Sequence, residues 1–369
     1  MTPGGTGNVR GIRFGISGVA ALALGAMALV IGACSSKDIR NQSVATVNGE
    51  EIRVEELREF LGFRGGATPA AGIPAEKKKE ALDRLVAGRL LAQDARAGGL
   101  DNTEAYRAGL AQNEQGVWIA ALLRKEVAAK LKVKDDEVKA EAKKLREADN
   151  TISEGDAAQR AVQSLSDAQL RKIEQDLVEA ARKEFPGTID REVLQKVGKG
   201  GKIPDNAVLA TVGTSRITYG ETMRTLQAMV PGGHGAAEIA QNPAMVERVL
   251  DREITGRSLE AYARKQGLEG SETLKYVRRD MERSILINLA ATRAVSVAGQ
   301  VTDKEIADAY AEHQQTFVRD GKKIPLAQVK EQIRQFLQNG KQRKALEEHI
   351  AGLKKNARIS VHEDVLAKA

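Results

Sequence analysis

The sequence predicts a mainly α-helical protein with small β-hairpins, formed by two tandem copies of one helical module. Its composition is 42% hydrophobic but only 3% aromatic, with 29% charged residues, which is typical of a protein rich in solvated helices. Apolar residues recur at three- and four-residue steps over long segments, the period of a helix with one buried face. An internal repeat indicates the tandem arrangement.

The repeat is strongest between residues 81–100 and 249–268, which align without gaps and are identical at ten of twenty positions. The same offset of 168 residues holds between 133–144 and 301–312. Upstream, "ATVNGEEI" matches "ATVGTSRI" at a slightly shorter offset. Low-complexity helix could imitate one such match, but three in the same order indicate a duplicated domain.

Each copy begins with a predicted β-hairpin. In the first copy, apolar residues alternate around Asn48-Gly49, a dipeptide that favours a tight hairpin turn. The second copy has Gly213-Thr214 at this place, a weaker turn. The apolar spacing then predicts, in the first copy, helices near residues 55–61, 75–97 and 103–131, and a fourth that begins near 133.

Each copy is expected to end with a helix and a short tail, because "TIDREVL" (188–194) echoes "SVHEDVL" (360–366). Residues 326–357 predict a long amphipathic helix, and "RISV" (358–361) is expected to pair as a strand with a hairpin. The resulting domains are a first module at 44–198, a linker at 199–206 and a second module at 207–369.

Several charged residues and a glycine recur in the two long helices. Asp83, Arg84 and Arg89 have identical partners in the second copy, and ion pairs and packing explain them better than a functional site does. Gly88 and Gly256 lie in mid-helix, where glycine costs about 1 kcal/mol relative to alanine. Their recurrence predicts a close approach of another helix at both positions.

The N-terminal segment, residues 1–33, predicts a secretion signal. It carries Arg10 and Arg13, no acidic residue and an apolar run over 14–31. A permanent membrane anchor is the alternative, since the run approaches the ~20 residues that span a bilayer. "IGAC" (31–34) resembles the lipobox of bacterial lipoproteins, which implies cleavage between Ala33 and Cys34 and a lipid on Cys34.

The segment after the cleavage site predicts a polar tether over residues 34–43. Ser35 stands where an inner-membrane retention signal has Asp, so resemblance to the lipoprotein sorting rule implies an outer-membrane location facing the periplasm. Cys34 is the only cysteine, so no disulfide is expected to stabilise the fold. The net charge of +7 comes from basic residues interleaved with acidic ones, and nucleic-acid binding is not expected.

The order of these motifs resembles that of the SurA-like periplasmic foldases (SurA, PrsA, PpiD and their relatives). "VATVNGEEIRVEEL", "LDRLVAGRLLAQDARAGGL" and "VKDDEV" resemble the N-terminal chaperone domain, here present twice. "VKEQIRQFLQNGKQRKALEEHIAGLKKNARISV" resembles the C-terminal helix and strand that return to complete that domain. The resemblance implies modules that hold unfolded outer-membrane or secreted polypeptides along partly exposed apolar helices.

The family usually carries a parvulin prolyl-isomerase domain before the closing helix. Here "AYAEHQQTFV" (309–318) continues through "RDGKKIP" into that helix, which leaves no room for such a domain. His234, His313, His349 and His362 are scattered and fit no nucleophilic, acid–base or metal-binding arrangement. We therefore expect no catalytic residue, no metal and no cofactor.

The candidate client-binding residues are large apolar side chains on or near the loops and the third helix. Packing in the core is the competing interpretation for most of them. These candidates are Phe60, Phe63, Trp118, Met223 and Met229.

The predicted function is that of a lipid-anchored periplasmic chaperone that binds unfolded or exported proteins without ATP. A prolyl isomerase with residual activity is one alternative, because the family usually has that activity. A structural adaptor lipoprotein of a secretion or export system is another.

Overall fold

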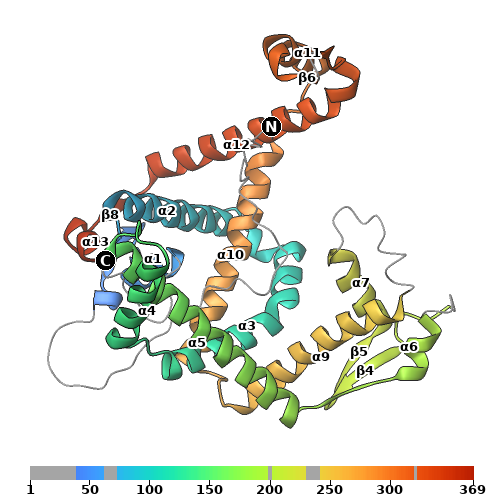
Figure 1. Cartoon of the computed structure of the whole chain (residues 1–369). Coiled ribbons are helices and arrows are strands. Elements are labelled where there is room, and N and C mark those ends of the chain that lie inside the picture. The colour runs from blue at the N-terminus through green and yellow to red at the C-terminus, as the bar shows by residue number, and fades with distance from the viewer. Residues whose placement is uncertain (1–38, 62–72, 198–201, 230–241, 320–321) are drawn as a thin grey trace. The chain divides into compact units, whose positions relative to one another are not determined.

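The structure is a computed structural model, described here for residues 39–61, 73–197, 202–229, 242–319 and 322–369. The described chain is mainly α-helical with small antiparallel β-sheets (Figure 1), which confirms the predicted fold class. Two three-stranded sheets have the orders β2-β1-β8 and β3-β4-β5, and β6 pairs with β7.

The secondary structure repeats along the chain. The first copy consists of β1 (Ser43–Val47), β2 (Glu50–Arg53), α1 (Val54–Phe60), α2 (Ala75–Ala97), α3 (Glu104–Lys130), α4 (Asp135–Ala148), α5 (Glu154–Glu184), β3 (Gly187–Ile189) and α6 (Arg191–Val197). The second consists of β4 (Val208–Val212), β5 (Ser215–Thr218), α7 (Tyr219–Met229), α9 (Pro243–Lys265), α10 (Glu272–Ser296), α11 (Asp303–Glu312), α12 (Leu326–Asn356), β8 (Ile359–Val361) and α13 (Glu363–Lys368). Helices α2 and α9 both have 23 residues, and α5 and α12 both have 31.

The two hairpins share the pairing of their strands. Strands β1 and β4 have the same alternation of buried residues, and each pairing shifts register at the same place, between Ser43 and Ala45 or between Val208 and Ala210. Asn48 and Gly49 both have positive φ, 51° and 90°, which is the backbone of a type I′ turn. The Asn-Gly dipeptide therefore forms the turn that it predicts.

Each hairpin is completed by a strand from the other copy. β8 follows the closing helix of the second copy and pairs antiparallel with β1 of the first, with Val47 opposite Ile359. β3 follows the closing helix of the first copy and pairs with β4 of the second, with Val212 opposite Gly187. The predicted strand at 358–361 thus pairs with a hairpin as expected, and the two copies exchange their last strands.

The exchange extends to the helices that carry these strands. Lys354 on α12 pairs with Asp83 on α2, and Arg182 on α5 pairs with Asp251 on α9. These two ion pairs occupy equivalent positions of the repeat. Each joins the closing helix of one copy to the long helix of the other, so the recurring aspartates hold the exchanged segments.

The chain forms two compact units, and both contain segments of both copies. Within the described residues, one comprises 58–61, 73, 111–197, 202–229 and 242–281, and the other comprises 39–57, 74–110, 282–319 and 322–369. We call them the β4 unit and the β1 unit after their central strands. The units cross the boundary between the modules predicted at 44–198 and 207–369.

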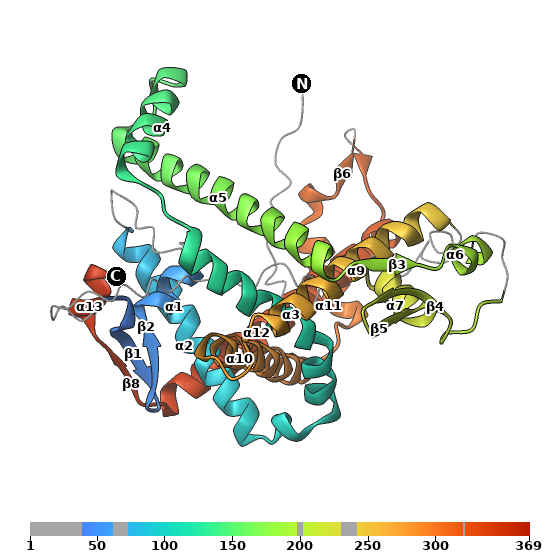
Figure 2. The same ribbon diagram turned by 90° about the horizontal axis from the view of Figure 1, so that it is seen from below.

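The β4 unit has its main core between the β3-β4-β5 sheet and the helices α6, α7 and α9 (Figure 2). Leu209, Ile217 and Leu250 are among its fully buried side chains. A second small core between α4 and α5 contains Ala142 and Ala157. Burial of such apolar surface stabilises the unit by ~25 cal/mol per Å².

The β1 unit has two helical cores besides its sheet. Leu91 on α2 and Leu286 on α10 pack with the C-terminal half of α12. The N-terminal half of α12 buries Val329 and Ile333 against Ile306 of α11. Helix α12 therefore spans from one core to the other within this unit.

The connection between α11 and α12 is short. It contains the 3-10 helix η4 (Gln314–Thr316) and the strands β6 (Val318–Arg319) and β7 (Lys322–Lys323). Tyr310 stacks on Phe317 with ring centroids 5.4 Å apart, and its hydroxyl donates a hydrogen bond to the carbonyl oxygen of Ile324 at 2.6 Å. These contacts close the connection over the core between α11 and α12.

The recurring mid-helix glycines allow close contacts, as predicted. A Cβ on Gly88 would lie 3.2 Å from Cδ1 of Ile287, and one on Gly256 would lie 2.9 Å from Oε1 of Gln115. Distances this short require the neighbouring side chain to move. Glycine at these positions lets α10 approach α2 and α3 approach α9.

Candidate polypeptide-binding surfaces

The structure places the predicted client-binding residues in different environments. Trp118 on α3 is buried, donates its indole N–H to Oε1 of Glu114 at 3.1 Å and stacks under Arg264, 4.3 Å from the ring centre. Met223 is half-buried against the core of the β4 unit. These two side chains serve packing in this structure.

Two other predicted residues are exposed. Phe60, at the end of α1, and Met229, at the end of α7, each expose nearly half of their surface. Phe63, Ala33 and Cys34 lie outside the described residues, so the lipid attachment site and one candidate have no structural description here.

Met229 is accompanied by a second methionine that sequence reasoning did not identify. Met245 is exposed in the first turn of α9, and α9 packs beside α7. The sulfur of Met229 lies 3.8 Å from Nη1 of Arg252, and that of Met245 lies 3.9 Å from Nη1 of Arg248. Methionine side chains adapt to differently shaped apolar surfaces, and a guanidinium group lies beside each of these two.

The most exposed aromatic side chain of the described chain is Phe336 on α12. Val329, Ile333 and Phe336 occur at i, i+4 and i+7 on one helix face. The first two are buried against α11, whereas Phe336 is 66% exposed. Gly340 follows on the same face with open space around it. Phe336 therefore lies at the edge of the buried face of α12, outside the core that α12 forms with α11.

Comparison of the two copies shows that the fold does not require an aromatic residue at this position. The equivalent residue of α5 is Ser164, which is also exposed. Its neighbours Ala157 and Ala161 are buried at the places of Val329 and Ile333. A large apolar residue at an exposed position, with a polar residue in the related copy, is the signal that identifies Phe336.

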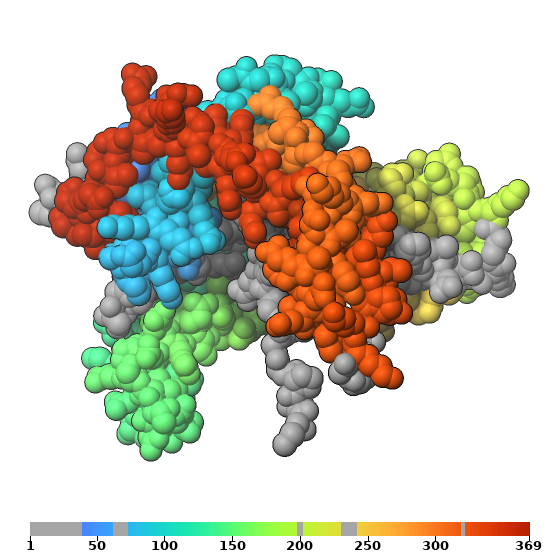
Figure 3. All heavy atoms as spheres, turned by 90° about the horizontal axis from the view of Figure 1, so that it is seen from above, coloured from blue at the N-terminus to red at the C-terminus, as the bar shows by residue number. Residues whose placement is uncertain are grey.

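Ion pairs join α12 to α11 on both sides of Phe336. Toward its N-terminus, Lys330 and Arg334 contact Asp303 at 3.0 Å. Nearer its middle, Lys341 forms an ion pair with Glu305 at 2.9 Å, and this contact lowers the pKa of Glu305 to about 2. Figure 3 shows α12, in red, at the surface of the molecule.

A buried ionic cluster links the first hairpin to the helices of the β1 unit. Glu56 accepts hydrogen bonds from Nη2 of Arg89 at 2.7 and 2.9 Å and lies 3.4 Å from Nη1 of Arg283. Burial raises the pKa of Glu56, although Arg89 acts in the opposite direction. The guanidinium of Arg89 also donates to the backbone oxygen of Glu51, so the cluster connects β2, α1, α2 and α10.

The second copy has an equivalent of this pair. Glu221 lies 3.6 Å from Arg257, and these residues occupy the positions of Glu56 and Arg89 in the repeat. Both side chains are more exposed to solvent than those of Glu56 and Arg89. Glu221 also accepts hydrogen bonds from the backbone N–H and the hydroxyl of Thr218. This recurrence identifies the pair as a structural link of each module.

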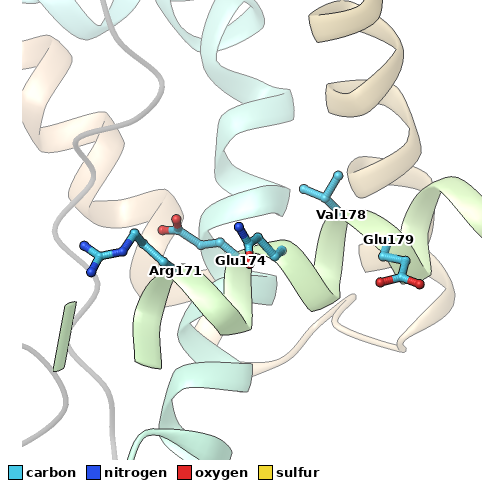
Figure 4. A pocket seen from close by; sticks show the side chains of 5 residues that line it. Arg171, Glu174, Val178 and Glu179 are labelled. Atoms are coloured by element: carbon cyan, nitrogen blue, oxygen red, sulfur yellow. The ribbon is translucent and has the colours of Figure 1, made fainter. Parts of the chain in front are cut away.

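A hollow of about 370 Å³ lies along α5 (Figure 4). Its lining residues are mostly exposed and charged, and one of them is aliphatic: Arg171, Glu174, Gln175, Val178 and Glu179. All five residues belong to one helix, so the hollow is an open surface feature and differs from the enclosed clefts that hold small molecules. No group of three metal-ligating side chains is placed to hold an ion within the described ranges.

No family model, curated protein or solved structure matches this chain significantly. Among the described helices, none is both long enough and apolar enough to cross a membrane.

Proposed function

We propose that this protein is a lipid-anchored chaperone of the bacterial cell envelope that holds unfolded outer-membrane or secreted polypeptides without ATP. The observation that carries the proposal is the exposure of Phe336 on a helix held at both ends. A rigid helix that offers an aromatic side chain to solvent can bind an apolar segment without losing its own conformational entropy.

The exposed methionines of the β4 unit supply a second surface of the same kind. Apolar contacts from Phe336, Met229 and Met245 are separate and adaptable, which suits clients of varied sequence. The resemblance to SurA-like modules and to the lipoprotein signal supports the same function, and we propose that the protein acts at the periplasmic face of the outer membrane.

The test is suppression of aggregation of an unfolded β-barrel protein by the full chain. Phe336→Ser, which installs the residue of the related copy, should weaken suppression several-fold while the far-UV spectrum stays the same. Gln335→Ser on the same helix is the matched control, since Gln335 is exposed and polar. Absence of suppression by the wild-type protein at several-fold molar excess contradicts the proposal.

Two further measurements separate the alternatives. We expect no acceleration of proline-limited refolding, and clear acceleration would favour a prolyl isomerase. Affinity purification from solubilised membranes should recover many substoichiometric clients, whereas one stoichiometric partner would favour an adaptor lipoprotein.

A further inference from the structure

The outer edge of β8 is open for strand pairing. In the order β2-β1-β8, β8 is a terminal strand (Figure 2). Its bonds to β1 come from alternate residues: the N–H of Asn48 donates to the oxygen of Arg358 at 2.8 Å, and the N–H of His362 donates to the oxygen of Val44 at 2.9 Å. Because backbone groups alternate in direction along a strand, those of Ile359 and Val361 point away from β1.

The side chains of this edge are apolar and partly exposed. Ile359 and Val361 lie opposite Val47 and Ala45, which are completely buried, so they are on the core face of the sheet. They are nevertheless 37% and 38% exposed. Natural edge strands are protected by very short length, charged residues, proline or bulges. β8 is only three residues long, but it contains no charged residue, proline or bulge.

The equivalent strand of the other sheet offers less apolar surface. In β3, Gly187 takes the place of Ile359, and Ile189, at the place of Val361, is half-buried against the core of the β4 unit. The fold therefore forms without an exposed isoleucine and valine on this strand, so the apolar edge of β8 is a property of its own residues.

The residues around β8 are complementary to a second copy of themselves. Lys355 and Arg358 precede the strand, whereas Glu363 and Asp364 follow it. All four are exposed and form no ion pair within the described part of the chain. In a two-fold antiparallel pair, the basic start of one strand lies beside the acidic end of the other.

The backbone geometry fits the same arrangement. A two-fold axis through Ser360 places Ile359 opposite Val361 of the second copy, and Val361 opposite its Ile359. These residues carry the outward-facing backbone groups, so both pairs exchange N–H···O bonds. Their side chains lie on the core face in both copies, and each isoleucine then covers a valine.

We propose that the outer edge of β8 is a homodimerisation surface, where it pairs antiparallel with β8 of a second copy. The β2-β1-β8 sheet of one copy and the same sheet of the second copy then form one continuous six-stranded sheet. The short strand makes a dimer whose population depends on protein concentration. Helix α13 leaves this edge open because it turns back onto the unit, where its Ala367 oxygen accepts a hydrogen bond from Nζ of Lys78.

The first test is sedimentation velocity of the full chain over a wide range of concentration, in detergent if it is lipidated. We expect a monomer–dimer equilibrium, with the amides of Ile359 and Val361 protected from hydrogen exchange only at high concentration. Ile359→Pro removes an outward N–H and no bond to β1, and it should abolish dimers while β1 stays protected.

Charge reversal gives a test that misfolding cannot imitate. A variant with Lys355→Glu and Arg358→Glu, and another with Glu363→Lys and Asp364→Lys, should each be monomeric because like charges meet. Their mixture should form one-to-one dimers, since both ends of the pair are then complementary.

A wild-type protein that stays monomeric at all concentrations overturns the proposal, as does a dimer that Ile359→Pro and the charge variants leave unchanged. Protection of β8 only after addition of an unfolded model client would also overturn it and would assign the edge to client binding.

Discussion

Glu56 and Arg89 form a buried ion pair, with Nη2 and Oε2 2.7 Å apart, in which the carboxylate belongs to α1 and the guanidinium to α2. Their equivalents in the second copy, Glu221 and Arg257, are 3.6 Å apart and more exposed. One interaction thus occurs twice in the same chain at different depths, which makes each pair a control for the other.

Arg89→Ala should lower the free energy of unfolding by about 3–5 kcal/mol, because it leaves the buried carboxylate of Glu56 without its main partner. Arg257→Ala should cost only about 0–1 kcal/mol, the range of solvent-exposed pairs. Urea unfolding followed by circular dichroism measures both. Equal losses in the two variants would show that burial does not distinguish the pairs.

The pH dependence of Glu56 follows from its raised pKa. A carboxyl group with a higher pKa in the folded state binds its proton more tightly there, so its contribution to stability is complete below the unfolded value of 4.5 and decreases as the pH rises through the folded pKa. The difference in unfolding free energy between wild type and Glu56→Gln should therefore fall as the pH rises from 4.5 through the folded pKa of Glu56. A difference that rises with pH would contradict the assignment.

Glu305 should behave in the opposite way. Its pKa of about 2 lies below the ordinary 4.5, mainly because Lys341 donates a hydrogen bond to it. The stability that it contributes is complete above 4.5 and is lost as the pH falls toward 2. Lys341→Ala should move the pKa of Glu305 back toward 4.5 in an NMR titration of the side-chain carboxyl, and Lys344→Ala, which changes an exposed neighbour, should leave it in place.

The exchange of strands predicts a local effect of truncation. Removal of residues 358–369 takes β8 and α13 from β1, so hydrogen exchange of the amides over 43–53 should accelerate strongly. The amides over 208–218 should keep their protection, because β3 still pairs with β4. Faster exchange in the second hairpin and not in the first would mean that each copy closes on itself.

Cys34→Ser tests the membrane anchor. The variant should leave the membrane fraction or retain its signal segment, because serine cannot form the thioether to a lipid. Its folded units should keep their thermal unfolding midpoint. Fractionation and processing identical to wild type would contradict lipidation.

Local patterns predicted the elements of this fold, but not their partners. The Asn48-Gly49 turn and the apolar stripes of α2 and α12 are properties of neighbouring residues, so the sequence reveals them. The pairing of "RISV" (358–361) with β1 does not follow from neighbouring residues. Strands β1 and β4 have the same pattern, and a strand that fits one fits the other, so the choice depends on the path of the whole chain.

The candidate surface was predictable only in part, for a related reason. Trp118 and Phe336 both lie on apolar helix faces, and periodicity treats them alike. Trp118 is buried because another helix covers it with Arg264, whereas Phe336 is exposed because it lies at the edge of the face of α12 that packs against α11. Exposure depends on which part of the helix face the neighbouring helix covers, and the sequence of α12 does not contain that information.

The contact between Asn48 and Arg358 joins residues that are 310 positions apart. A chain that emerges at 5–20 residues per second needs roughly 15–60 s to supply the second residue after the first. During that interval β1 has one edge without its strand, and non-local pairing of this kind also folds slowly. Until the C-terminal strand has been made, this edge of β1 is open to incorrect pairing with other strands.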